Sequence, residues 1–166
     1  MDHRLNDLPH VSAYISLVFT GAIFGFFYAW VCSTMWGLDD ADPRVAIAAM
    51  QAMNDSVQNA VFFPAFFLTP VVLLVTGLIV RRRCGAGGWF VAAAIVYAVG
   101  AMLLTLVVNV PMNDDLAATS IPASTDAAQD VWDAYSRPWQ RWNVVRTAVS
   151  GVSLVLAGVG LATIRR

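Results

Sequence analysis

The stretch "VVRTAVSGVSLVLAGVGLATI", residues 144–164, is long and apolar enough to cross a lipid bilayer. A membrane-spanning helix needs about 20 mostly apolar residues, and this run contains a single charge, Arg146. Its apolar residues are continuous rather than alternating, which favours a helix over a strand. Because only helices and closed barrels satisfy every backbone polar group in lipid, the run predicts one helix of a membrane bundle.

Three earlier apolar runs have the same character, at about residues 11–36, 60–80 and 89–110. The 166 residues are 58% hydrophobic and only 13% charged, whereas an average soluble domain carries about 25% charged residues. The sequence therefore predicts an all-α fold, a four-helix transmembrane bundle that forms a single integral membrane domain over residues 1–166. The expected helices lie at about 11–36, 43–80, 89–110 and 138–164.

The arginines predict the orientation of the bundle. The chain has no lysine, and six of its ten arginines fall on one side of the predicted bundle, at Arg4, 81–83 and 165–166. Positive charge collects on the cytoplasmic side of membrane proteins, so we expect both termini in the cytoplasm, with the chain in a bacterial inner (plasma) membrane. The opposite, outer side receives segments 37–59 and 112–143, which hold nine of the eleven aspartates.

The first outer segment has the pattern of an amphipathic helix. Asp42 before Pro43 is typical of a helix start, with a carboxylate cap and proline in the first turn. From there polar and apolar residues recur at steps of three and four. The pattern predicts a helix that packs over the bundle mouth through Met50, Met53 and Val57. We expect it to run into the second membrane helix with a kink near Pro64.

The second outer segment predicts a shorter helix before the last membrane helix. Asp126, three residues before Gln129, is typical of a capping pair. Pro138 marks the expected start of the last membrane helix. Four tryptophans gather on this side, and the ordinary explanation for each is the aromatic belt at the membrane interface; they are Trp36, Trp132, Trp139 and Trp142.

Arg146 lies about one helical turn inside the apolar boundary, where an unpaired charge is unfavourable. Two alternatives follow from its position. It can extend to the outer headgroups, or it can face the bundle and pair with acids and amides. In the second case Pro111 would break the third helix and free carbonyls that need donors. The candidate partners of Arg146 are then Asn54, Asp55, Asn109 and Asn113. The predicted polar cluster consists of Asn54, Asn109, Asn113, Asn143 and Arg146.

Two short motifs in this region resemble those of the anthrone oxygenase family. The first is "NVPMND", residues 109–114, and the second is "WQRWNVVR", residues 139–146. The matching positions are Asn109, Pro111, Asn113, Trp139, Trp142, Asn143 and Arg146. The resemblance implies four membrane helices and oxidation of an aromatic, lipid-soluble substrate, as anthrones are oxidised to anthraquinones with dioxygen.

Such chemistry needs a base, hydrogen-bond donors and an aromatic pocket. An anthrone has an acidic methylene, and donors would stabilise the oxyanion that forms when a base removes its proton. The expected catalytic residues are Arg146 and Asn109 as donors and Asp55 as the base. His3 and His10, the only histidines, lie on the predicted inner side. The expected substrate-binding residues are Asn54, Asn113, Asn143, Trp139 and Trp142.

We expect no cofactor and no metal, because two histidines, two separated cysteines and no glutamate do not supply the usual haem or di-iron ligands. The expected partners are a hydrophobic small molecule and membrane lipid, and a net charge of −1 does not favour nucleic acid. An alternative function stays open, a non-enzymatic membrane protein that binds a small molecule or lipid or serves assembly. Small residues such as Gly21 and Gly25 would allow a homo-oligomer.

Overall fold

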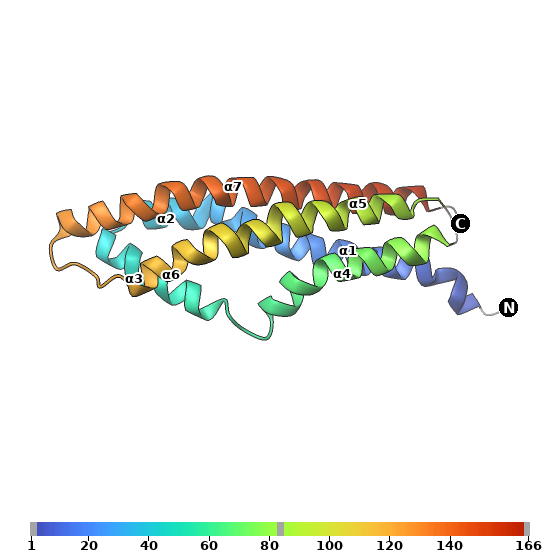
Figure 1. Cartoon of the computed structure of the whole chain (residues 1–166), viewed down its shortest axis with the longest axis horizontal. Helices are drawn as coiled ribbons and strands as arrows, with labels where there is room; N and C mark the ends of the chain where they lie inside the picture. Colours follow the sequence, from blue (N-terminus) through green and yellow to red (C-terminus); the bar gives the residue numbers. More distant parts are fainter. Residues whose placement is uncertain (1–2, 83–84, 165–166) are drawn as a thin grey trace.

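The computed structural model describes residues 3–82 and 85–164, and its regular elements are all helices. Four helical segments are long and apolar enough to cross a membrane, at Asp7–Asp39, Phe62–Arg81, Gly87–Ala118 and Thr125–Thr163. They lie side by side in an elongated bundle (Figure 1). The predicted all-α membrane bundle is confirmed, and its four long apolar helices fit a multi-pass membrane protein.

The helices follow the chain in a simple order. The first segment comprises α1 (His3–Ala29), a π-helical turn and α2 (Met35–Asp39), followed by α3 (Pro43–Ser56) and α4 (Phe62–Arg81). The next consists of α5 (Gly87–Tyr97), two π-helical turns and α6 (Val110–Ala118), and α7 (Thr125–Thr163) is the longest helix. Both described ends of the chain lie at one end of the bundle, while α2, α3 and α6 lie at the other (Figure 1). We call the latter the outer end.

The outer helix α3 forms as the sequence predicts. Asp42 caps it, since its Oδ1 accepts a 2.9 Å hydrogen bond from the backbone N–H of Arg44. The hydrogen bonds from Arg44 lower the pKa of the Asp42 carboxyl to about 2. Ile47 and Met50 are fully buried and pack in one cluster with Trp132. The predicted amphipathic layer at the outer end is therefore confirmed.

The expected continuous helix over residues 43–80 is wrong. The chain turns at residues 57–61 and separates α3 from α4. Asn59 explains the restart, because its Oδ1 accepts from the backbone N–H groups of both Val61 and Phe62. Pro64 lies in the first turn of α4, where its missing N–H leaves no helical bond unmade. Here a cap, and not a proline kink, divides the two helices.

Two helix boundaries that were predicted at prolines are also wrong. Pro138 lies inside α7, which already begins at Thr125, and the cap is Ser124, whose Oγ accepts from the Ala127 N–H. Gln129 donates to Asp133 and forms no cap with Asp126. Pro111 does not break the third membrane helix, which continues to Ala118. The backbone instead widens into π-helical turns at Ala98–Leu103 and Thr105–Asn109, the second of which ends two residues before that proline.

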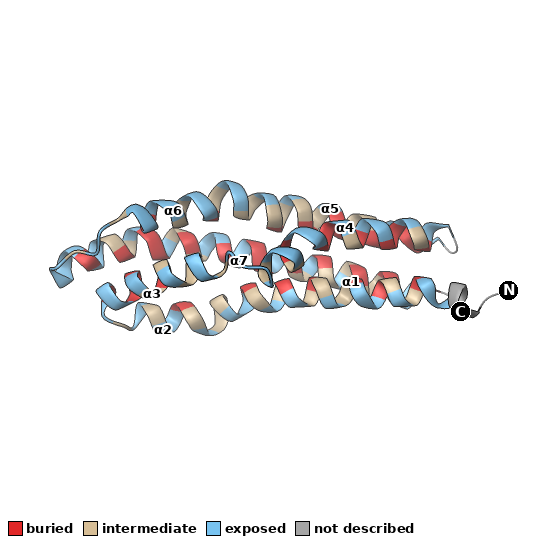
Figure 2. Ribbon diagram, turned by 90° about the horizontal axis from the view of Figure 1, so that it is seen from below, coloured by how far each residue is buried: buried red, intermediate tan, exposed pale blue. Residues whose placement is uncertain are grey.

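Burial follows the packing of the bundle. Figure 2 shows exposed residues along the faces of the long helices that point away from the bundle. These faces carry large apolar side chains such as Val18, Val107 and Val155, each more than half exposed. In water such a surface would be unfavourable, but in lipid it is the expected outer surface. The polar side chains that the bundle buries are therefore the ones that require an explanation.

Candidate functional site

Arg146 faces the interior of the bundle. The residue is only 4% exposed. Nε donates a 2.8 Å hydrogen bond to Oδ1 of Asn143, and Nη1 donates a 3.4 Å bond to Oγ1 of Thr105 on the neighbouring helix. The alternative in which this arginine extends to the headgroups is therefore wrong, and the guanidinium belongs to an internal site.

Two aromatic rings lie against the guanidinium of Arg146. Its carbon lies 4.4 Å from the ring centroid of Phe27 on α1 and 4.8 Å from that of Trp139 on α7. A cation over an aromatic face is attracted by the ring quadrupole, more strongly where water is scarce. The two rings thus offset part of the cost of burying the charge, without neutralising it.

Asn143 fixes Arg146 from within α7. The asparagine is 1% exposed, and its Nδ2 donates a 3.2 Å hydrogen bond to the backbone carbonyl of Phe27. Its Oδ1 is the acceptor for Arg146. One amide group therefore connects α1 and α7 and holds the guanidinium in a defined orientation.

A second polar cluster lies about two to three turns of α7 from Arg146, towards the outer end. Asn113 on α6 accepts two hydrogen bonds at Oδ1, 2.8 Å from the Tyr135 hydroxyl and 2.9 Å from Nε1 of Trp139. Asn54 on α3 donates a 3.4 Å bond to the same tyrosine hydroxyl. Because Trp139 bonds Asn113 and also lies against Arg146, the two clusters are connected.

The clusters border a cavity of about 480 Å³, within the range of about 300–1,000 Å³ that is typical of small-molecule sites. Its aromatic wall includes Phe26, Phe27, Trp30, Phe62, Phe66 and Trp139. Its polar lining includes Arg146 and Thr105 at the inner end and Asn54, Asp55, Asn113 and Asp114 towards the outer end. A flat ring would find apolar walls there, with one cation and several amides at the ends.

Most predicted site residues come together in this cavity, but not with the expected partners. Arg146 forms no hydrogen bond with Asn109, Asn113, Asn54 or Asp55, and bonds Asn143 and Thr105 instead. The physical reason is that the third membrane helix continues past Pro111, so the expected break with free carbonyls does not exist. Asp55 is exposed and lines the cavity.

Three predicted residues do not line the cavity: Trp142, Asn109 and Asn143, which binds Arg146 from behind the lining. Trp142 is 42% exposed and does not line it. Asn109 is fully buried, and its two amide atoms have no hydrogen-bond partner among the described residues. It also does not line the cavity. A buried amide without partners is costly, so Asn109 is an unexplained polar group one turn from Thr105.

The sequence reasoning missed several residues around this site. Phe27, Thr105 and Tyr135 all contact the polar clusters, yet each lies in an ordinary apolar or amphipathic pattern. The one sequence signal for this group was the position of Thr105, four residues before Asn109. Tyr135 gave no signal of its own, because its partners lie on α3 and α6.

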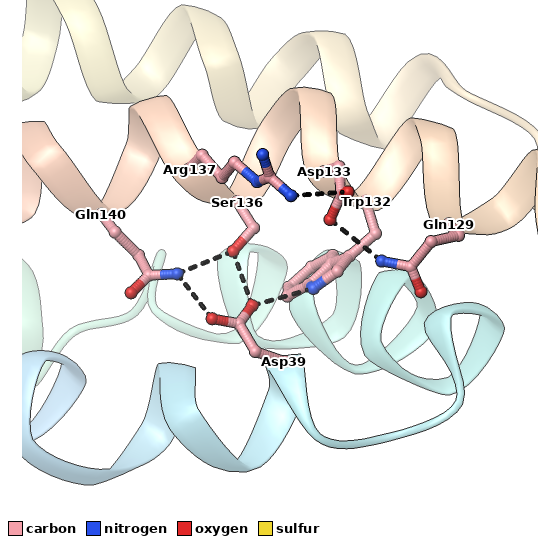
Figure 3. A network of polar contacts seen from close by, with 7 residues as sticks. All are labelled: Asp39, Gln129, Trp132, Asp133, Ser136, Arg137 and Gln140. Atoms are coloured by element: carbon pink, nitrogen blue, oxygen red, sulfur yellow. Dashed lines mark hydrogen bonds and ion pairs between the residues drawn. The ribbon is translucent and has the colours of Figure 1, made fainter.

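Asp39 was missed as well, and it anchors α2 to α7 (Figure 3). Its carboxylate accepts hydrogen bonds from Nε1 of Trp132 at 2.9 Å, Oγ of Ser136 at 2.7 Å and Nε2 of Gln140 at 2.7 Å. This network keeps the outer part of α7, which supplies Trp139, in place over the cavity.

Comparison with known proteins identifies a matching protein family. The family model described as anthrone oxygenase matches residues 56–156, which is more than half of the chain and includes Arg146 and the third membrane helix. No curated protein matches the chain, and no solved structure does. Within the described residues, no group of three or more His, Cys, Asp or Glu side chains could hold a metal ion.

Proposed function

Because this chain belongs to the anthrone oxygenase family, we propose that it oxidises an aromatic, lipid-soluble substrate with dioxygen in the cavity that Arg146 lines. The observation that carries the proposal is the combination of an aromatic-walled cavity of about 480 Å³ with a buried guanidinium at its inner end. Aromatic walls suit a flat ring system, and the guanidinium suits an oxygen that becomes negative.

The reaction balances without a further co-substrate. A base removes a proton from the methylene of an anthrone, and the electron-rich carbanion that results passes electrons to dioxygen. A carbon–oxygen bond forms at this carbon, and the peroxide loses water. The methylene and one O₂ thus yield a carbonyl and one water, which converts an anthrone to an anthraquinone.

The cavity residues take defined roles in this proposal. Arg146 donates to the oxyanion that forms on the substrate, and Trp139 and Phe27 hold the ring. Asp55 is the proposed base, since it is the predicted carboxylate that lines the cavity; Asp114 lines the same end. Asn109 stays a proposed participant because its buried amide lacks a partner among the described residues.

The test is turnover by the purified protein in lipid nanodiscs. With an anthrone under air, we expect anthraquinone absorbance to rise and oxygen to be consumed one to one, faster than in empty nanodiscs. The Asp55→Asn variant should slow the reaction because the amide cannot accept the proton. The Asp114→Asn variant shows whether the other carboxylate at this end of the cavity acts as the base instead. A rate equal to that of empty nanodiscs would refute the proposed activity.

A second candidate function is binding of a small molecule or lipid without chemistry. The exposure of Asp55 favours it, because an exposed carboxylate is not held in position against a methylene inside the cavity. Binding of an anthrone or anthraquinone in the cavity, together with oxidation no faster than in empty nanodiscs, would support this alternative.

For the location, we propose a bacterial inner membrane with both termini in the cytoplasm. Support comes from the C-terminal end of α4, which carries Arg81 and Arg82 and lies at the same end of the bundle as both described chain ends (Figure 1). Cys84, close by in sequence, lies outside the described residues. In a Cys32→Ala background, an impermeant thiol reagent added outside intact cells should label Ala123→Cys and spare Cys84. The reverse pattern would invert the orientation.

A further inference from the structure

We propose that the cavity binds its aromatic ligand as an anion, a phenolate or enolate whose negative oxygen pairs with Arg146. The inference rests on the proposed function and narrows its substrate class, from any lipid-soluble aromatic to one that carries an acidic hydroxyl or an enolisable ketone. Four features of the described residues carry it.

The first feature is the missing counter-ion. The ion pairs among the described residues are Arg44–Asp42 and Arg137–Asp133, both at the surface. Arg146 has neutral acceptors, Asn143 and Thr105, and no carboxylate partner in this part of the chain. A buried cation is strongly unfavourable unless an opposite charge compensates it, and an anionic ligand would supply that charge.

The second feature is a free edge of the guanidinium. Nε and Nη1 of Arg146 each have a hydrogen-bond partner, whereas Nη2 has none among the described residues. Among the described residues, the enclosed side-chain atoms that lack a partner are the two amide atoms of Asn109. Nη2 of Arg146 is therefore not fully enclosed. Since Arg146 lines the cavity, its guanidinium retains a donor at the inner end of the cavity that no described residue uses.

The third feature is the aromatic surface around that donor. Phe27 and Trp139 lie against the guanidinium, and the rings of Phe26 and Phe62 contact each other at a tilt, with centroids 4.8 Å apart. All four line the cavity. Stacking favours a flat ring over a flexible acyl chain, so the anionic oxygen belongs on an aromatic system.

The fourth feature is the distribution of charge and access. The titratable side chains that line the cavity are Asp55 from α3, Asp114 from α6 and Arg146 from α7, while α1 and α4 contribute apolar and aromatic side chains. Both aspartates are exposed at the outer end, whereas Arg146, the cation of the cavity lining, is buried at the inner end. Phe63 and Phe67 line the cavity and are about 40% exposed on the side of α4 that faces away from the bundle. Their exposure favours entry of the ligand from the lipid.

A matched ligand pair tests the proposal in nanodiscs. 2-Hydroxyanthraquinone ionises with a visible colour change, whereas anthraquinone has the same rings and no acidic group. We expect the bound hydroxyl to ionise at a lower pH than in empty nanodiscs, and anthraquinone to bind at least about tenfold more weakly, a difference of about 1.4 kcal/mol. Arg146→Gln should abolish both differences. Arg141→Gln, with an exposed arginine on the same helix, should keep them.

The wild-type ligand pair alone decides the question if the Arg146 variant fails to fold. Equal affinity for the two ligands, an unshifted ionisation, or no binding of either would overturn the inference. So would palmitate that displaces the dye as strongly as a second phenolate does. The proposed function fails separately: phenolate selectivity without anthrone oxidation supports the inference alone, and oxidation without phenolate selectivity supports only the function.

Discussion

Nε of Arg146 donates a 2.8 Å hydrogen bond to Oδ1 of Asn143, one turn earlier on α7. Asn143 donates in turn to the backbone carbonyl of Phe27 on α1. The arginine is thereby held by its own helix and, through one amide, by the neighbouring helix. This arrangement orients a charge in the bundle interior without neutralising it, and it leaves Nη2 without a hydrogen-bond partner among the described residues.

Asn143→Asp should weaken the binding of anionic ligands. The new carboxylate would lie beside the Arg146 guanidinium and supply the missing counter-charge, so a phenolate would gain less from the same arginine. We expect lower affinity for 2-hydroxyanthraquinone and little change for anthraquinone, measured by the dye titration in nanodiscs. Unchanged phenolate selectivity would show that the charge of Arg146 does not bind the ligand.

Asn109→Leu should leave the stability unchanged or raise it. The buried amide has no hydrogen-bond partner among the described residues, so the substitution breaks no described bond and removes the cost of an unpaired polar group. We expect an equal or higher Tm together with reduced anthrone turnover if the amide takes part in the reaction. Full turnover would remove Asn109 from the proposed site.

Asn113→Leu provides the matched comparison on the same helix. It removes the acceptor of both Tyr135 and Trp139, which are buried donors. Leaving buried donors unpaired costs about 1–3 kcal/mol, so the Tm should fall clearly below that of Asn109→Leu. A similar Tm for the two variants would mean that the hydrogen bonds of Asn113 contribute little.

Asp39→Ala should loosen the outer end of the bundle. The substitution leaves Nε1 of Trp132, a residue only 2% exposed, without its acceptor. The hydroxyl of Ser136, also 2% exposed, loses its acceptor as well, while water can replace the acceptor for the half-buried Gln140. We therefore expect a loss of about 1–3 kcal/mol, read from thermal unfolding. Asp133→Ala is the control, since it breaks an exposed pair with Arg137 that is worth about 0–1 kcal/mol. A smaller effect of Asp39→Ala than of the control would contradict the anchoring role.

Two glycines of α7 should respond differently to alanine. A Cβ at Gly160 would lie 2.6 Å from Cε2 of Phe90, which is fully buried and cannot move freely, whereas a Cβ at Gly158 would meet nothing within 4 Å. Gly160→Ala should cost about 1–3 kcal/mol through overpacking. Gly158→Ala should be neutral or slightly stabilising. Thermal unfolding of both variants measures the difference, and equal Tm values would argue against close packing of α5 on α7.

The bundle could be predicted from the sequence because length and apolar continuity suffice for a membrane helix. The position of Arg146 one turn inside the apolar boundary left two alternatives, the headgroups and the bundle interior, and the structure shows the second. Its partners did not, because they depended on a break at Pro111 that π-helical turns avoid. Asp39 and Trp132 are bonded across 93 positions of sequence, and no local pattern reveals a contact of that kind.

The most direct test of the account is the anthraquinone formation rate of Arg146→Gln in nanodiscs, with Arg141→Gln as the matched control. Loss of one donor to a developing oxyanion lowers turnover about 10²–10³-fold in well-studied cases. We expect a loss of this order for Arg146→Gln, a partial loss for Arg146→Lys, and a rate close to wild type for Arg141→Gln, with all variants folded by thermal unfolding. Wild-type turnover by a folded Arg146→Gln protein would contradict the account.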